Sequence, residues 1–140
     1  MITAETTTLV LRLMLAHTAL LTAAPYVQGL SGDPEAWRDN IPLLVSFLLA
    51  PLTAGYLVRS GNVRIGSVLL LSFMPAGVYA NVVFLRTAAE SAAARVMSPA
   101  WHIVHLAILS FLVIIQVTSA ILSAGMLRNV HQRATLPPEA

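Results

Sequence analysis

Four long apolar segments dominate the chain, at roughly 7–29, 41–58, 64–85 and 100–127. Each approaches or exceeds the roughly 20 residues that an α-helix needs to cross about 30 Å of hydrocarbon. Because lipid cannot hydrogen-bond to a backbone, a segment inside it must satisfy its own N–H and C=O groups as a helix. The pattern therefore predicts an all-α fold, an integral membrane four-helix bundle that residues 1–140 form as a single transmembrane domain.

Polar residues between the apolar segments supply turns and helix caps. Asp33, followed by Pro34, is suited to cap a short turn after the first segment, and Asn40 is suited to cap the second helix. The tripeptide Ser60-Gly61-Asn62 is typical of a tight turn between the second and third segments. These signals predict compact connections on both sides of the second helix.

Thr87 and Glu90 have the spacing of a capping box, in which a hydroxyl and a carboxylate satisfy the first N–H groups of a helix. This spacing predicts a short interfacial helix at 88–97. Ser98 and Pro99 would then begin the fourth spanning helix. Residues 128–140 would follow it as a tail.

The placement of arginine predicts the orientation. The connection after the second segment carries Arg59 and Arg64, and the tail carries Arg128 and Arg133, whereas the first connection is mainly acidic. Since cytoplasmic loops are enriched in arginine and lysine, we expect both termini to be cytoplasmic. The expected location is the bacterial inner (cytoplasmic) membrane, which the chain would cross several times.

The composition agrees with a bilayer as the solvent. Charged residues make up only 10% of the chain, against about 25% in a soluble domain, and the mean hydropathy is +0.79. The absence of cysteine excludes disulfides, thiol redox chemistry and cysteine-bound iron–sulfur clusters. The basic residues are scattered between apolar segments, which argues against nucleic-acid binding.

The first segment also has some features of a cleaved signal peptide, with Thr22-Ala23-Ala24 as the cleavage site. A signal peptide begins with a positively charged stretch. The first eleven residues here contain Glu5 and no basic residue. A retained helix is therefore the favoured interpretation.

Polar residues inside the spans can be sorted by depth, at about 1.5 Å per residue. His105 and Asn81 come out about 7 Å and about 5 Å below the outer boundary, in one layer with Tyr26, Tyr79 and His102. One interpretation is a ligand pocket with aromatic walls, which would hold a lipid or a quinone. The other is a set of interfacial residues with one interhelical hydrogen bond.

His17, Pro51 and Pro75 fall about 15 Å from a boundary, near the midplane. Each proline frees the carbonyl four residues earlier, on Phe47 or Leu71. In lipid such a carbonyl needs a donor, and the N–H of His17 is the expected one. The two interpretations are packing between kinked helices and a hinge or ligand site at the midplane.

A third layer near the inner boundary holds Arg12, Tyr56 and Gln116. Arg12 either extends to the cytoplasmic headgroups or meets Gln116 inside the bundle.

Small residues recur on three of the spans and predict close approach of helices, within the chain or to a partner protein. They are Ala50, Ala54 and Gly55; Ala76, Gly77 and Ala80; and Ser119, Ala120, Ser123, Ala124 and Gly125.

Enzymatic chemistry is not indicated, because no serine–histidine–acid set, phosphate-binding loop or glycine-rich nucleotide motif occurs. Every Asp and Glu lies in a loop or a tail, which argues against a cation-coupled antiporter. A bis-histidine haem would need His17 and His105 at one depth, but they differ by about 8 Å. Zinc bound by His102 and His105 would need a third ligand. No cofactor or metal is therefore predicted.

The layout resembles several families of small bacterial four-helix membrane proteins, including the DoxX-like group, in topology and in the Arg-Ser-Gly-Asn-Val-Arg turn at 59–64. The glycine and lysine typical of the end of a DoxX-type first helix are replaced here by Tyr26-Val-Gln28. The resemblance therefore implies a topology and no functional residue.

The sequence as a whole favours a small polytopic membrane protein that acts as a non-enzymatic accessory or structural subunit. Its expected partners are the lipid bilayer and either further copies of itself or a larger membrane complex. A small-solute carrier or channel gated at the kinked helices is the main alternative. A haem-bearing membrane anchor, with two protomers sharing the iron, is a weaker one.

Overall fold

The computed structural model describes residues 3–30, 41–92 and 99–134, and their regular structure is entirely α-helical. The helices are α1 (Ala4–Leu30), α2 (Ile41–Arg59), α3 (Val63–Ala92) and α4 (Pro99–Ala134). By length and composition, α1, α3 and α4 can cross a membrane, whereas the described part of α2 is a shorter apolar helix. The all-helical class and the membrane character predicted from the sequence are confirmed.

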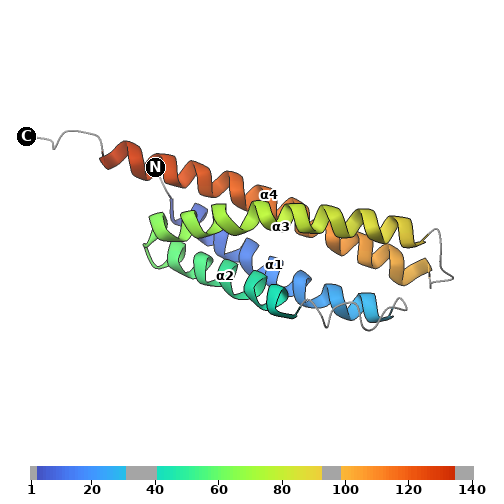
Figure 1. Ribbon diagram of the computed structural model, residues 1–140. Coiled ribbons are helices and arrows are strands. Elements are labelled where there is room, and N and C mark those ends of the chain that lie inside the picture. Colours follow the sequence, from blue (N-terminus) through green and yellow to red (C-terminus); the bar gives the residue numbers. More distant parts are fainter. Residues whose placement is uncertain (1–2, 31–40, 93–98, 135–140) are drawn as a thin grey trace, which may run out of the picture.

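Successive helices run in opposite directions and lie side by side (Figure 1). α1 packs against α2 and α4, and α3 packs against the same two helices, so the contacts form a closed ring. The start of α1, the turn between α2 and α3, and the end of α4 all lie at one end of the molecule (Figure 1). We call this the hairpin end.

The predicted turn at 60–62 is confirmed. Gly61 adopts a φ of 98°, the left-handed conformation that favours glycine after the end of a helix. The N–H of Ser60 donates to the Tyr56 carbonyl at 2.8 Å, and the N–H of Gly61 donates to the Val58 carbonyl. The last carbonyls of α2 are therefore satisfied before α3 begins.

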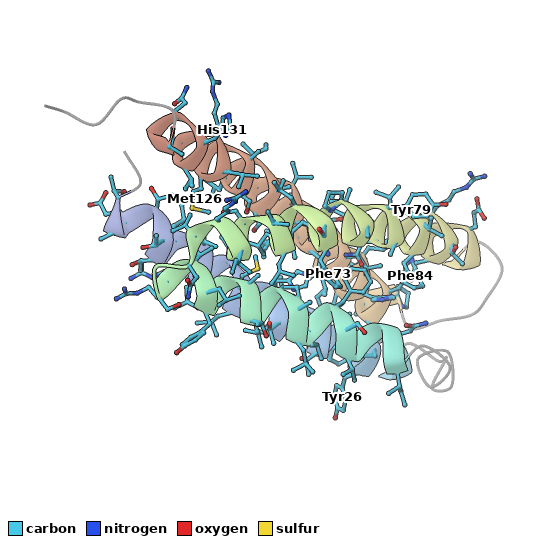
Figure 2. All side chains as sticks on the ribbon, turned by 60° about the vertical axis from the view of Figure 1, so that its left-hand side comes forward. Tyr26, Phe73, Tyr79, Phe84, Met126 and His131 are labelled. Carbon is cyan, nitrogen blue, oxygen red and sulfur yellow. The ribbon has the colours of Figure 1, made fainter. Side chains whose placement is uncertain are left out.

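Apolar side chains lie both inside and outside the helices. The buried cluster on the hairpin side of the interior consists of Val10, Met14, Ala54, Val58, Leu70, Met74 and Met126. Large apolar side chains such as Leu49, Ile103 and Phe111 project outward and are more than half exposed, and Figure 2 shows side chains around the whole perimeter. In water such a surface is unusual for a monomer, whereas in a bilayer lipid covers it.

α2 and α3 approach each other closely because Gly66 has no side chain. A Cβ at this position would lie 2.7 Å from the Ala54 carbonyl oxygen and 2.7 Å from Val58 Cγ2. Backbone atoms cannot move aside as the tip of a long side chain can. Gly66 therefore sets the spacing of these two helices.

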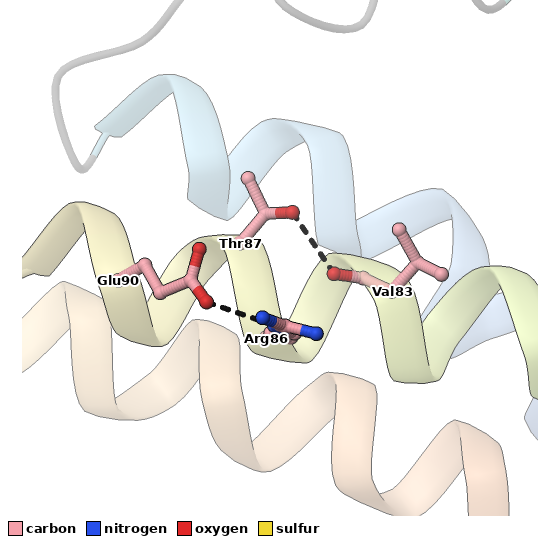
Figure 3. Close-up of polar contacts among 4 residues, drawn as sticks. All are labelled: Val83, Arg86, Thr87 and Glu90. Atoms are coloured by element: carbon pink, nitrogen blue, oxygen red, sulfur yellow. Dashed lines mark hydrogen bonds and ion pairs between the residues drawn. The ribbon is translucent and has the colours of Figure 1, made fainter.

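The predicted capping box at Thr87 and Glu90 is wrong, because α3 continues through both residues to Ala92. The Thr87 hydroxyl donates to the Val83 carbonyl of its own helix, and Arg86 Nε donates to Glu90 Oε1 at 2.8 Å (Figure 3). Both patterns are regular side-chain contacts along one helix face. The predicted helix start at 88 lies inside α3, and positions 93–97 lie outside the described residues.

α4 likewise extends beyond its predicted end at 127, to Ala134. The arginine and glutamine residues of this region are good helix formers. They continue the helix past the apolar segment, so part of the predicted tail is helical. Residues 135–140 of that tail lie outside the described residues.

Gly66→Ala should lower the free energy of unfolding by about 1–3 kcal/mol, because the new methyl group collides with the backbone of α2. The measurement is thermal or SDS-induced unfolding in detergent, followed by circular dichroism. Gly125→Ala, measured on monomeric protein in detergent, is the matched control, since nothing in the same chain lies within 4 Å of a Cβ there. It should be neutral or stabilising by up to about 1 kcal/mol. Equal effects of the two substitutions would contradict the close approach at Gly66.

Candidate functional site

A network of buried polar side chains connects three of the four helices. His17 on α1, Gln116 on α4 and Asn81 on α3 lie in contact near the middle of the molecule. The Gln116 Nε2 atom is 3.1 Å from His17 Nε2, and Asn81 Nδ2 donates to Gln116 Oε1 at 3.0 Å. Gln116 is therefore the central member, with one hydrogen bond to each neighbouring helix.

The three side chains are almost completely removed from solvent. Their exposed fractions are 0% for His17, 1% for Gln116 and 4% for Asn81. A polar group in such a place costs free energy unless a partner satisfies it. Burial of this kind, in a span that is otherwise apolar, is the pattern expected of groups that face the interior of a membrane protein.

The direction of the hydrogen bonds fixes the histidine tautomer. An amide nitrogen only donates, so His17 Nε2 accepts from Gln116. The ring hydrogen is then on Nδ1. Nδ1 is itself buried and has no hydrogen-bond partner among the described residues. The network of hydrogen bonds therefore ends at the Nδ1–H group of His17, a donor that has no acceptor among the described residues.

Gly77 makes room for the central amide. A Cβ on Gly77 would lie 2.5 Å from Gln116 Nε2 and 3.0 Å from Gln116 Cδ. The flat amide of Gln116 therefore lies directly against the backbone of α3. In the sequence Gly77 stands out only as one of several small residues, whereas in the structure it is part of the polar site.

The depth count placed His17, Asn81 and Gln116 in three different layers, and the structure corrects this grouping by joining them. The count assumed that each helix begins and ends where its apolar segment does. α3 and α4 in fact run on beyond those limits, so the levels at which their residues meet are set by packing. The reach of the glutamine side chain closes the remaining distance.

The expected bond from His17 to a carbonyl freed by a proline is not formed. Nε2 of His17 binds Gln116, and Nδ1 has no partner in the described chain. Both prolines lie within continuous helices, Pro51 in α2 and Pro75 in α3. Pro51 is buried and Pro75 is exposed. A hinge or ligand site formed by His17 with Pro51 and Pro75 stays a prediction.

The residues assigned to the outer layer differ in exposure and direction. Tyr26 and Tyr79 point outward, with exposed fractions of 73% and 75% (Figure 2). Asn81 instead turns inward to Gln116. His105 is buried and lies about three turns before Gln116 along α4, and His102 beside it is partly buried. Ligand binding by these residues stays a prediction.

The residues assigned to the inner layer also differ in exposure. Arg12 and Tyr56 are both exposed, whereas Gln116 is in the interior. Arg12 lines a shallow hollow on the outer face of α1 together with Glu5 and Thr8. This position agrees with an arginine that reaches for headgroups and not with one that meets Gln116.

Three buried serines add further polar groups to the interior. Ser119 donates to the Ile115 carbonyl of its own helix at 2.7 Å. The hydroxyls of Ser67 and Ser123 are buried and have no partner among the described residues. In the sequence, Ser119 and Ser123 stand out only as small residues, and Ser67 does not stand out. The third span contains two serines, Ser67 and Ser72, and only the structure shows that Ser67 is buried and Ser72 is exposed.

The described residues contain no group of three His, Asp or Glu side chains placed to bind a metal ion. The buried polar network consists of one histidine and two amides, which suit hydrogen bonding and not metal ligation. Its evident physical effect is to hold α1, α3 and α4 together at a fixed level.

Comparison of the chain with models of protein families, with curated proteins and with solved structures finds no match.

Gln116→Ala should lower the free energy of unfolding by about 1–3 kcal/mol, because two interhelical hydrogen bonds are lost and their partners stay buried. Gly77→Ala should have a similar cost, since the methyl group displaces the Gln116 amide. The decisive measurement is the double variant in SDS titration. Once residue 116 is alanine, Gly77→Ala should lose most of its cost. Additive effects of the two substitutions would contradict the proposed contact.

Proposed function

We propose that this protein is a non-enzymatic subunit or accessory protein of the bacterial cytoplasmic membrane. In this proposal its four helices form one bundle in the bilayer, and its outer face associates with further copies of itself or with a larger membrane complex. The observation that carries the proposal is that polar side chains of the interior bind one another. His17, Gln116 and Asn81 bind one another and tie three helices together.

The distribution of polar groups supports a structural role over a catalytic one. An enzyme active site presents unpaired acids, bases or nucleophiles to a substrate in a cleft. Here the amides of Gln116 and Asn81 are engaged with each other in the interior. The described carboxylates, Glu5 and Glu90, are exposed and lie on different helices. The helices themselves make up most of the described chain, which leaves little mass outside the bilayer.

The small residues divide into an inner and an outer group. Ala54, Gly55, Gly77, Ser119 and Ser123 are buried within the chain. Ala124 and Gly125 on α4 are exposed, and a Cβ at Gly125 would have nothing within 4 Å. Small exposed residues on a spanning helix permit close approach of another helix. This part of α4 is therefore the proposed contact with a partner helix.

Native mass spectrometry of protein gently extracted from its own membrane should show a dimer or a stable complex with another protein. Gly125→Leu should reduce the associated fraction by about tenfold, because a bulky side chain prevents close approach at that face. Ala107→Leu, at an exposed alanine on the same helix, is the control and should leave association unchanged. A monodisperse monomer with no bound protein would contradict the subunit role.

The proposed orientation places the hairpin end in the cytoplasm. Arg59 ends α2, Arg64 lies in the first turn of α3 and Arg128 lies in the last turns of α4, so all three are at this end. Positive charge marks the cytoplasmic side of a membrane protein. The fold places the start of α1 and the end of α4 at the same end of the molecule. The proposal that this end faces the cytoplasm rests on these arginines.

Single cysteines introduced into this cysteine-free chain should report the orientation directly. Ser60→Cys, in the exposed turn, should react with a membrane-impermeant maleimide only after the cells are permeabilised. Gly32→Cys, in the first connection, should react in intact cells. The reverse pattern would place the hairpin end outside and contradict the proposed topology.

A further inference from the structure

An open groove lies between α3 and α4 at the hairpin end. Its volume is about 550 Å³. One wall is the face of α3 formed by Arg64, Val68 and Leu71, and the other is the face of α4 that includes Leu127, Arg128 and His131. The α3 positions are three or four residues apart, and on α4 His131 follows Leu127 by four residues and Arg128 by three, so each wall is a single helix face.

The groove is basic at its outer end and apolar further in. Arg64 lies in the first turn of α3, and Arg128 and His131 lie in the last turns of α4, where Figure 2 labels His131. Val68 and Leu71 follow on α3 toward the centre of the span, and Leu127 lies inward of Arg128 on α4. The groove thus changes from charged to apolar along its length.

In the described ranges, no carboxylate pairs with these basic side chains. Among the described residues, the ion pair of the chain is Arg86 with Glu90, at the other end of α3. Glu5, the described carboxylate nearest to the chain start, lines a separate hollow on α1. An anion in the groove would therefore meet uncompensated positive charge.

A second hollow adjoins the first and shares Arg64 with it. Its volume is about 590 Å³, and its lining includes Arg59, Asn62 and the hydroxyl-bearing residues Thr3 and Thr7. Arg64 therefore lies between two hollows, with a further arginine and several hydrogen-bond donors within the second. This arrangement extends the basic end of the groove across the hairpin end of the molecule.

We propose that the groove between α3 and α4 binds one anionic phospholipid, with its phosphate between Arg64 and Arg128 and an acyl chain along Val68, Leu71 and Leu127. Arginine suits phosphate because its guanidinium offers paired donors. Basic hollows between spanning helices are suited to anionic headgroups. The apolar inner walls favour a lipid over a soluble phosphate, because a free anion leaves that surface uncovered. The inference rests on the membrane location of the chain. Ala124 lines this groove, so the lipid would lie beside the partner contact proposed at Gly125, but the test below needs no partner.

The test is native mass spectrometry from detergent micelles that contain equal amounts of phosphatidylglycerol and phosphatidylcholine with the same acyl chains. The wild-type protein should retain phosphatidylglycerol in preference to phosphatidylcholine. In the double variant Arg64→Gln, Arg128→Gln the preference should fall by about tenfold or more, since each arginine near a phosphate contributes a severalfold change in affinity. Both side chains are exposed, and circular dichroism checks that the helix content is unchanged.

Arg86→Gln is the matched control. Like each of the two groove substitutions, it removes one positive charge, here from an exposed arginine at the opposite end of α3, and it should leave the lipid preference at its wild-type value. Equal retention of the two lipids by the wild type would overturn the proposal. An equal loss in Arg86→Gln would also overturn it, because the effect would then reflect net charge alone. Displacement of the lipid by an excess of glycerol phosphate would assign the groove to a soluble phosphate. A protein that associates with no partner but retains phosphatidylglycerol would refute the subunit role and leave this inference intact.

Discussion

The amide of Gln116 is the contact on which the arrangement of α1, α3 and α4 depends. It binds His17 on one side and Asn81 on the other, and in a bilayer no water competes for these groups. Apolar side chains alone hold spanning helices together weakly, because lipid offers them equivalent contacts. A polar side chain that finds its partners in only one arrangement selects that arrangement over others of similar packing.

The glycines determine which helices can come close enough for these contacts. Gly77 lets the Gln116 amide lie against α3, and Gly66 brings α3 against the backbone of α2. Gly55 does the same for α2 and the Met14 side chain of α1. Close backbone approach and buried hydrogen bonds thus support each other, since the short amides can bridge only helices that are already near. This combination explains why the interior holds polar groups without being open.

Charge and polarity follow a simple division along the molecule. The centre holds the hydrogen-bonded side chains of His17, Gln116 and Asn81. At the hairpin end, Arg59, Arg64 and Arg128 are exposed and line two hollows whose described linings contain no acid. The first arrangement stabilises the protein internally. The second is available to the surroundings. Both proposed relations of this chain to other molecules, to a partner helix at Gly125 and to an anionic lipid at Arg64, therefore lie on α3 and α4 and outside the polar centre.

The sequence by itself determined the helical class, the membrane character and the turn at Gly61, because these depend on local composition and backbone preference. It also identified His17, Asn81 and Gln116 as unusual polar residues within apolar spans. Only the tertiary structure decided that these three meet, that Tyr26 and Tyr79 face outward, and that Thr87 lies inside a helix. The physical reason is that meeting depends on the rotation, tilt and relative shift of whole helices. Those quantities are set by glycine contacts between distant segments, which no count along one segment can supply.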